Sequence, residues 1–272
     1  MNSFISNKFF LKKEKILQDK ILKDGYIIFD IREKKRLQAI KNETKKFTVK
    51  WLKRNFNIDL KKNISLDYIH KLVPVSKLNK LRLYVFENLN KSKTFHENYF
   101  FIGKEFLDIL CGNELVMQKN INLSIQLVDD NSSLLPIHSD VYQGDSPYEL
   151  VLWIPLVNCS RTKSMYILPK KEHDKNHKNF KKFGSTDQIF KKLKHKLKWL
   201  KIDYGQGLIF TQNILHGNSV NKEKTSRWSF NCRFKTLLSP YDGKTIGDFF
   251  VPITLRSATK LGMDYVPPKI KK

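Results

Sequence analysis

The second half of the chain contains a series of short segments that are rich in β-branched and aromatic residues. Clusters of turn-forming residues, such as Asp129, Asp130 and Asn131, separate these segments. Runs of this length and composition, bounded in this way, are typical of β-strands. The segments are 121–128, 148–156, 164–168, 208–212 and 227–238. Several short strands in series predict an antiparallel β-sandwich or jelly roll.

The first 119 residues are instead expected to be mainly helical. Apolar residues recur there at about helical spacing among lysines, with Gly25 and Pro74 as breaks in the pattern. The helical segments are 10–21, 36–56, 78–89 and 98–110, with a short strand at 26–29 and a further amphipathic helix at 187–200.

We therefore expect an α+β fold and a single domain over residues 1–272. Its centre is a double-stranded β-helix (jelly roll, cupin-like) at 120–240. A mainly helical scaffold at 1–119 packs on this core, and 241–272 form a C-terminal extension.

The chain carries 51 Lys+Arg against 26 Asp+Glu, which gives a formal net charge of +25. Such a charge attracts phosphates, nucleic acid or anionic lipid head groups. Most of the excess is lysine, which is abundant throughout, so a general compositional bias explains it equally well. Since no aromatic residues are interleaved with arginines in a way that would stack bases, nucleic acid is not the expected partner.

The stretch 161–201 concentrates this charge, with fourteen Lys and Arg against three acidic residues. It favours an anionic or nucleotide-linked small-molecule substrate, or peripheral contact with an anionic membrane face. A solvated lysine surface is the alternative explanation.

The cysteines and the hydropathy pattern indicate the compartment. The three cysteines, Cys111, Cys159 and Cys232, include no CxxC pair, so neither a disulfide framework nor a cysteine zinc site is expected. No stretch approaches the roughly 20 apolar residues that cross a bilayer. A reducing cytoplasm and no transmembrane segment are expected.

Two histidines and an aspartate have the residue types of a non-haem iron site. His138 and Asp140 follow a predicted strand, where alternation puts residues two apart on the same side. His216 lies between two later strands. Two imidazoles and one carboxylate can hold Fe(II) on one face and leave the opposite positions open for a co-substrate and O2.

Arg227 heads an otherwise apolar strand eleven residues after His216, and Ser229 follows it two residues later. Burying an unpaired charge is costly, so the arginine predicts an anionic partner. A guanidinium pairs bidentately with a carboxylate, and a serine hydroxyl can add a hydrogen bond. The five positions together describe an oxygenase that uses Fe(II), O2 and 2-oxoglutarate as co-substrate.

The residues around these positions resemble the phytanoyl-CoA dioxygenase superfamily. The resemblance is carried by the runs 205–210 (GQGLIF) and 216–219 (HGNS), by Arg227, and upstream by 152–156 (LWIPL) and 164–169 (SMYILP). It covers most of 24–235 in order. The run 138–148 (HSDVYQGDSPY) is similar to a branch found in bacterial carbohydrate and surface-polysaccharide clusters.

The resemblance implies the roles of individual residues. His138, Asp140 and His216 are the implied iron ligands, and Arg227 with Ser229 the implied site for the distal carboxylate of 2-oxoglutarate. The implied reaction hydroxylates a small polar substrate, such as a sugar or sugar derivative in carbohydrate biosynthesis, and releases succinate and CO2.

Further candidates surround this set. Trp153 is a candidate for the co-substrate pocket, although a large aromatic in a strand also suits the core. Tyr142, Gln143, Asp145 and Tyr148 are candidates for substrate contact, although they also suit an ordinary polar turn. Two alternatives stay open: the same chemistry on nucleic acid or another polyanion, and a catalytically inactive jelly-roll binding protein.

Overall fold

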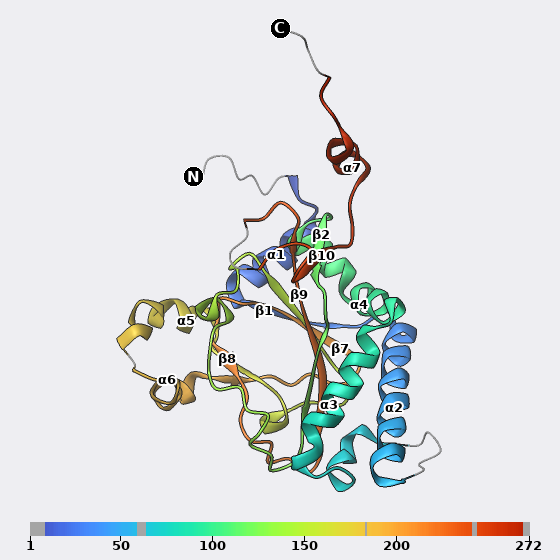
Figure 1. Cartoon of the computed structure of the whole chain (residues 1–272). Helices are drawn as coiled ribbons and strands as arrows, with labels where there is room; N and C mark the ends of the chain where they lie inside the picture. The colour runs from blue at the N-terminus through green and yellow to red at the C-terminus, as the bar shows by residue number, and fades with distance from the viewer. Residues whose placement is uncertain (1–8, 59–63, 183, 241–243, 269–272) are drawn as a thin grey trace.

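The computed structural model describes residues 9–58, 64–182, 184–240 and 244–268, which form helices and antiparallel sheets (Figure 1). Four helices dominate the N-terminal part, as the sequence predicted. They are α1 (Lys12–Asp24), α2 (Lys34–Phe56), α3 (Val75–Asn90) and α4 (Lys93–Cys111). The first ends at Gly25, whose φ of 79° lies in the left-handed region that favours glycine. The third begins directly after Pro74.

Seven strands form the main sheet. The order is β1-β7-β4-β9-β2-β10, with β3 also paired to β9, and every strand pair is antiparallel. Their bounds are β1 (Tyr26–Asp30), β2 (Leu115–Gln118), β3 (Asn122–Gln126), β4 (Leu150–Pro155), β7 (Gln206–Thr211), β9 (Arg227–Thr236) and β10 (Phe250–Pro252).

A smaller antiparallel sheet has the order β6-β5-β8. It consists of β5 (Tyr166–Ile167), β6 (Lys198–Trp199) and β8 (His216–Gly217). The remaining helices are α5 (Lys170–Asn176), α6 (Thr186–Leu193) and α7 (Ser257–Asp264), with the 3-10 turns η2 (Leu66–Lys71), η3 (Asp140–Gln143), η4 (Arg161–Lys163), η5 (His177–Lys182) and η6 (Lys194–Lys196). Figure 1 shows α2, α3 and α4 beside the main sheet, and α5 and α6 on the opposite side of the molecule.

The long strand β9 separates the apolar core from the cavity described below, because successive side chains of a strand point to opposite faces. Phe230 and Phe234 meet the helices, where the Phe230 ring lies 5.3 Å from that of Phe95. Arg227 and Arg233, on the other face, line the cavity. One strand therefore supplies both the packing that fixes its position and the polar side chains of the site.

Close packing of α4 on β4 fixes the other wall. A Cβ atom added to Gly103 would lie 2.7 Å from Leu152 Cδ2, so the helix approaches the strand as closely as glycine allows. The buried Tyr99 hydroxyl donates a 2.6 Å hydrogen bond to the Leu152 carbonyl. These contacts hold β4, and with it Trp153, against the helical layer.

The prediction of one amphipathic helix over 187–200 is wrong at its C-terminal end. The helix α6 ends at Leu193, and Trp199 lies in β6, paired with Tyr166 of β5. The two rings pack edge-on at 5.1 Å. Sheet hydrogen bonds and this aromatic contact outweigh the local helical pattern, as tertiary contacts commonly do.

Several elements were not predicted, among them β2, β8, β10, α5 and α7. The strand β10 pairs with β2, so part of the expected C-terminal extension joins the main sheet. In Figure 1, α7 projects away from the body of the molecule. Residues 241–243 and 269–272 of that extension lie outside the described residues.

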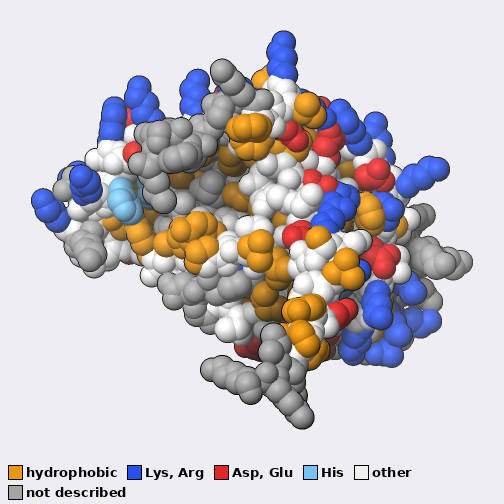
Figure 2. All heavy atoms as spheres, turned by 90° about the horizontal axis from the view of Figure 1, so that it is seen from above, with side chains coloured by type: hydrophobic (Ala, Val, Ile, Leu, Met, Phe, Trp, Pro, Cys, Tyr) orange, Lys and Arg blue, Asp and Glu red, His pale blue; other side chains and the backbone are white. Residues whose placement is uncertain are grey.

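Within the described ranges, no helix combines the length and the apolar character that a bilayer crossing needs. Figure 2 shows Lys and Arg side chains around the edge of one face and hydrophobic side chains towards its middle. One cation of the basic stretch has a structural role, since the buried Lys163 ammonium lies 2.7 Å from Asp67 Oδ1.

Candidate metal centre

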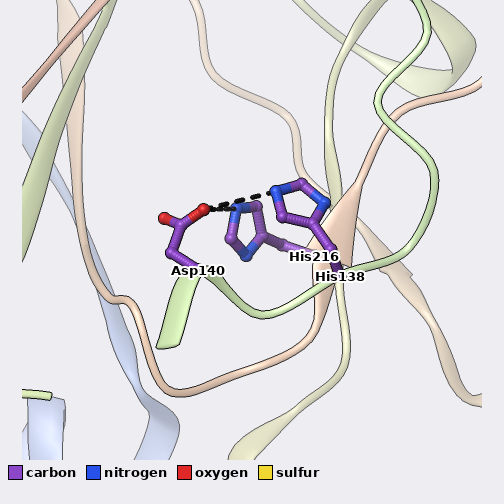
Figure 3. Close-up of side chains that lie close together, drawn as sticks. All are labelled: His138, Asp140 and His216. Atoms are coloured by element: carbon purple, nitrogen blue, oxygen red, sulfur yellow. Dashed lines mark ion pairs between the residues drawn. The ribbon is translucent and has the colours of Figure 1, made fainter. Parts of the chain in front are cut away.

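The structure brings His138, Asp140 and His216 together, although they come from two distant parts of the chain. His138 and His216 form a backbone bridge, with N–H to carbonyl distances of 2.9 Å and 2.8 Å. Asp140 begins η3 two residues later. One ligand atom from each side chain lies within 4.8 Å of the others, and Figure 3 shows the three side chains converging.

Ser139, between two of the candidate ligands, secures the loop that carries them. Its buried hydroxyl donates a 2.8 Å hydrogen bond to the Gln212 carbonyl, just after β7. Since alternate residues of an extended segment face opposite ways, this anchor leaves His138 and Asp140 on the cavity side.

Backbone carbonyls select the tautomers of both histidines. The Nδ1 atom of His138 lies 2.7 Å from the Pro136 carbonyl, and that of His216 lies 3.1 Å from the Ile214 carbonyl. A carbonyl can only accept, so each Nδ1 carries the hydrogen, and in the neutral ring Nε2 presents a lone pair. The two Nε2 atoms lie 3.3 Å and 3.9 Å from Asp140 Oδ1. Two lone pairs and a carboxylate therefore converge on one point, an arrangement that a divalent cation stabilises.

The pKa values agree with a deprotonated donor set at His216 and Asp140. Burial lowers the pKa of His216 to about 4. Burial opposes ionisation of Asp140, but its hydrogen bond to His138 and the charges around it hold its pKa at about 2. Burial opposes protonation of His138, but the protonated ring donates from Nε2 to Asp140 and from Nδ1 to the Pro136 carbonyl, so the pKa of His138 is raised. A metal ion would compete with the proton at His138.

A group of charges behind Asp140 was missed by the sequence reasoning. Arg233 Nη2 lies 3.7 Å from Asp140 Oδ2 and 3.0 Å from Asp145 Oδ2. The Lys244 ammonium pairs with Asp145, and the buried pair of Glu149 and Lys235 lies at 3.6 Å. The alternation of Arg227, Arg233 and Lys235 along one strand was the available signal, but their acidic partners depend on tertiary contacts.

Arg227 lines the same cavity as the three candidate ligands, a space of about 240 Å³. Its side chain is buried, and burial lowers its pKa. Its contacts are neutral: Nη2 donates to Ser124 Oγ at 3.2 Å and Nη1 to the Ser164 carbonyl at 3.5 Å. No carboxylate of the described residues lies within ion-pair distance, and Nε has no hydrogen-bond partner there. An arginine stays protonated, so this buried cation calls for an anionic ligand.

The other predicted residues are divided between the cavity and its surroundings. Trp153 and Gln143 line the cavity. Ser229 shares the strand face of Arg227, and its buried hydroxyl has no hydrogen-bond partner among the described residues. Sequence reasoning missed Ser124 and Asn231, which also line the cavity.

Three predicted substrate residues do not line the cavity. Asp145 is buried in the ion pairs with Arg233 and Lys244. Tyr142 is half-exposed, and its hydroxyl oxygen lies 2.6 Å from His177 Nδ1. Tyr148 is exposed to solvent. Asp145 and Tyr142 therefore contact neighbouring side chains instead of the cavity.

His173 is a buried histidine outside the metal centre. It packs against the rings of His177 and Phe180 at 5.2 Å and 5.4 Å, and its Nδ1 has no hydrogen-bond partner in the described part of the chain. Burial and the nearby His177 lower its pKa to about 4. The neutral ring therefore packs as an apolar group between α5 and η5.

This histidine is expected to make stability depend on pH. Its pKa lies below the roughly 6.5 of an unfolded histidine, so the unfolded chain binds the extra proton first and the folded state loses stability below pH 6.5. Between pH 7.5 and 4.5 the loss attributable to His173 is about 2 to 3 kcal/mol. Urea unfolding of the parent, His173→Phe and the exposed-site control His195→Gln measures it. Parallel pH curves for the parent and His173→Phe would contradict this assignment.

A scan of the sequence against protein-family models found no match, and a search of curated proteins found none either. Solved structures do resemble the fold. The non-heme monooxygenase ThoJ in a nickel complex is 14% identical with a TM-score of 0.49, covering 94% of this chain and 89% of that chain. EctD from S. alaskensis with bound Fe is 14% identical with a TM-score of 0.47, covering 86% and 80%.

HygX from Streptomyces hygroscopicus, with nickel and 2-oxoglutarate bound, is 10% identical with a TM-score of 0.49, covering 84% of this chain and 88% of that chain. At such identities these likenesses concern the course of the chain alone. The resemblance to the phytanoyl-CoA dioxygenase superfamily stays a prediction, and the chemistry of the site is inferred from its own side chains.

Proposed function

We propose that this protein is an Fe(II)- and 2-oxoglutarate-dependent oxygenase that acts on a small molecule. One observation carries the proposal: a single cavity holds the His138, Asp140 and His216 donor set together with Arg227, a buried cation paired with no carboxylate of the described residues. The donor set fits Fe(II), which accepts two imidazoles and one carboxylate on one face. The arginine fits the carboxylate of a co-substrate that also reaches the metal.

Each residue has a defined task in this proposal. The metal is held by the Nε2 atoms of His138 and His216 and by a carboxylate oxygen of Asp140. Arg227 binds the distal carboxylate of 2-oxoglutarate, and the Ser229 hydroxyl, which has no partner among the described residues, adds a hydrogen bond. Bound Fe(II) supplies the oxidation in which 2-oxoglutarate, O2 and a substrate C–H group give succinate, CO2 and an alcohol.

The cavity walls orient the co-substrate and exclude water. Trp153, Met165 and Phe210 are buried apolar side chains of this wall. An apolar wall that excludes water strengthens the ion pair between Arg227 and a carboxylate, since charges interact more strongly at low dielectric constant. The Arg233 guanidinium lies beside the other carboxylate oxygen of Asp140, Oδ2, and so positions this ligand.

The finer predictions belong to the same proposal. We infer that the two antiparallel sheets are those of a double-stranded β-helix, within one domain. The phytanoyl-CoA dioxygenase-like resemblance supports a sugar or sugar derivative as substrate and a role in carbohydrate biosynthesis, and the reducing cytoplasm remains the predicted compartment.

Anaerobic reconstitution tests the proposal. Protein with Fe(II) and 2-oxoglutarate is expected to show a weak visible charge-transfer band, and on addition of O2 it is expected to release succinate that candidate substrates stimulate. Candidate sugars, nucleotide sugars and oligonucleotides distinguish a small-molecule substrate from a polyanion. A protein that binds no iron and releases no succinate would instead be a binding protein without this chemistry.

A further inference from the structure

A second concave site adjoins the metal cavity. It is a groove of about 520 Å³ between α3, β3 and the loop at 132–135. Four residues line both spaces: Asn122, Ser124, Leu135 and Asn231. The groove therefore continues from the cavity that holds the candidate metal ligands to the surface of α3.

The groove exposes apolar side chains that the core does not cover. Val75 and Leu83 of α3 are 44% and 43% exposed, and Leu134 and Leu135 of the facing loop are 37% and 55% exposed. All four line this one space, together with the more buried Leu78. Apolar residues gathered on both sides of a concave surface mark a binding site more often than a solvated face.

Among the described residues, one charged side chain lines the groove, and it is a cation. Arg82 is exposed on α3, where its Nη2 donates a 2.6 Å hydrogen bond to Asn79 Oδ1, and no acid in the described part of the chain lies within ion-pair distance. A guanidinium in this setting pairs well with a carboxylate or phosphate group.

The inner end of the groove is polar. Asn122 and Asn231 are opposite each other in the pairing of β3 with β9, and the Asn122 amide donates a 3.1 Å hydrogen bond to Asn231 Oδ1. Ser124, which accepts from Arg227, lies in the same wall. A ligand in the groove thus meets polar side chains where it approaches the metal cavity.

We propose that this groove binds the substrate, and that the substrate is amphipathic, with an apolar body and an anionic end. The apolar body lies against Leu78, Leu83 and Leu134, and the anion pairs with Arg82. The carbon to be oxidised is then at the opposite end, beside Asn122 and Asn231. This inference rests on the proposed function, and a sugar derivative fits it when it carries an apolar, anionic substituent.

Direct binding to the metal-free protein tests the groove without requiring turnover. The probes are 4-phenylbutanoate, its neutral amide 4-phenylbutanamide and 4-phenylbutyl phosphate, titrated by calorimetry. The parent is expected to bind the anions at least about 10-fold more tightly than the amide, which corresponds to one charge-assisted contact. The more tightly bound anion identifies the end group.

Variants on the same helix locate the binding. Arg82→Gln is expected to remove the preference for the anions and leave the affinity for the amide unchanged, and Leu83→Asn to weaken all three probes. Lys80→Gln is the matched control, because Lys80 is an exposed cation of α3 that does not line the groove. Equal affinity for anion and amide, or equal losses in Arg82→Gln and Lys80→Gln, would overturn the proposal.

The oxygenase function and the substrate groove can be rejected independently of each other. His216→Ala removes a candidate metal ligand but no residue that lines the groove, so it is expected to keep the affinity for 4-phenylbutanoate. Absence of succinate release alongside selective binding would reject the oxygenase function and leave the groove intact. Succinate release without selective binding would reject the groove alone.

Discussion

His216→Ala is expected to abolish iron binding and succinate release. The imidazole is buried and its Nε2 atom faces Asp140 with a lone pair, and no fourth His, Cys, Asp or Glu among the described residues belongs to the donor group. Loss of outer partners of a metal ligand already costs about 10- to 100-fold in affinity, so loss of the ligand itself should exceed about 100-fold. Anaerobic titration with Fe(II), followed by the visible band in the presence of 2-oxoglutarate, measures the effect.

The control for this variant is His195→Ala, which removes an exposed histidine from η6. It is expected to bind iron like the parent. The His216→Ala protein is expected to keep its fold, because the backbone hydrogen bonds between His138 and His216 do not use the imidazole. Circular dichroism checks this. A folded His216→Ala protein with parental iron affinity would remove His216 from the metal centre.

Arg227→Met is expected to weaken 2-oxoglutarate binding by at least about 30-fold and to leave iron binding intact. Truncation of one partner of a buried charge pair costs about 2 to 5 kcal/mol, and 1.4 kcal/mol is tenfold in affinity. Titration of the iron-loaded protein with 2-oxoglutarate measures this loss. Arg54→Met, which removes an exposed arginine of α2, is expected to have no effect.

The same substitution should not destabilise the ligand-free protein. Arg227 is buried among neutral partners, and a buried charge without a counter-charge is unfavourable. Urea unfolding without ligand is expected to show Arg227→Met at least as stable as the parent. A large loss of stability together with unchanged 2-oxoglutarate affinity would show that Arg227 has a structural role.

Much of the fold follows from local patterns in the sequence. Apolar spacing predicted α1 to α4, and alternation predicted the strands around Trp153, Phe210 and Trp228. The error at 187–200 concerns Trp199, which fits the helical spacing of the sequence but lies in β6. Its partner Tyr166 is more than thirty residues away in the sequence, so no local pattern indicates this pairing.

The residues of the candidate site that lie together in the structure were also predicted from the sequence, namely His138, Asp140, His216 and Arg227. His138 and Asp140 are two residues apart in an extended segment, and the types of His216 and Arg227 indicated their chemistry. Asp145 shows the limit of the approach: a polar turn residue suggested a substrate contact, but the structure buries it against Arg233.

The sequence by itself determined the four N-terminal helices, most strands of the main sheet and the kinds of side chain available for a metal site. Spacing along one segment controls these features, because backbone geometry sets the periods of helix and strand. The tertiary structure alone decided that His138 meets His216, that Arg227 is buried without an acid among the described residues, and that α3 and β3 form a groove beside the metal cavity. These features depend on the long-range register of β9 with β3 and β4 and on the packing of the helices, which no local pattern specifies.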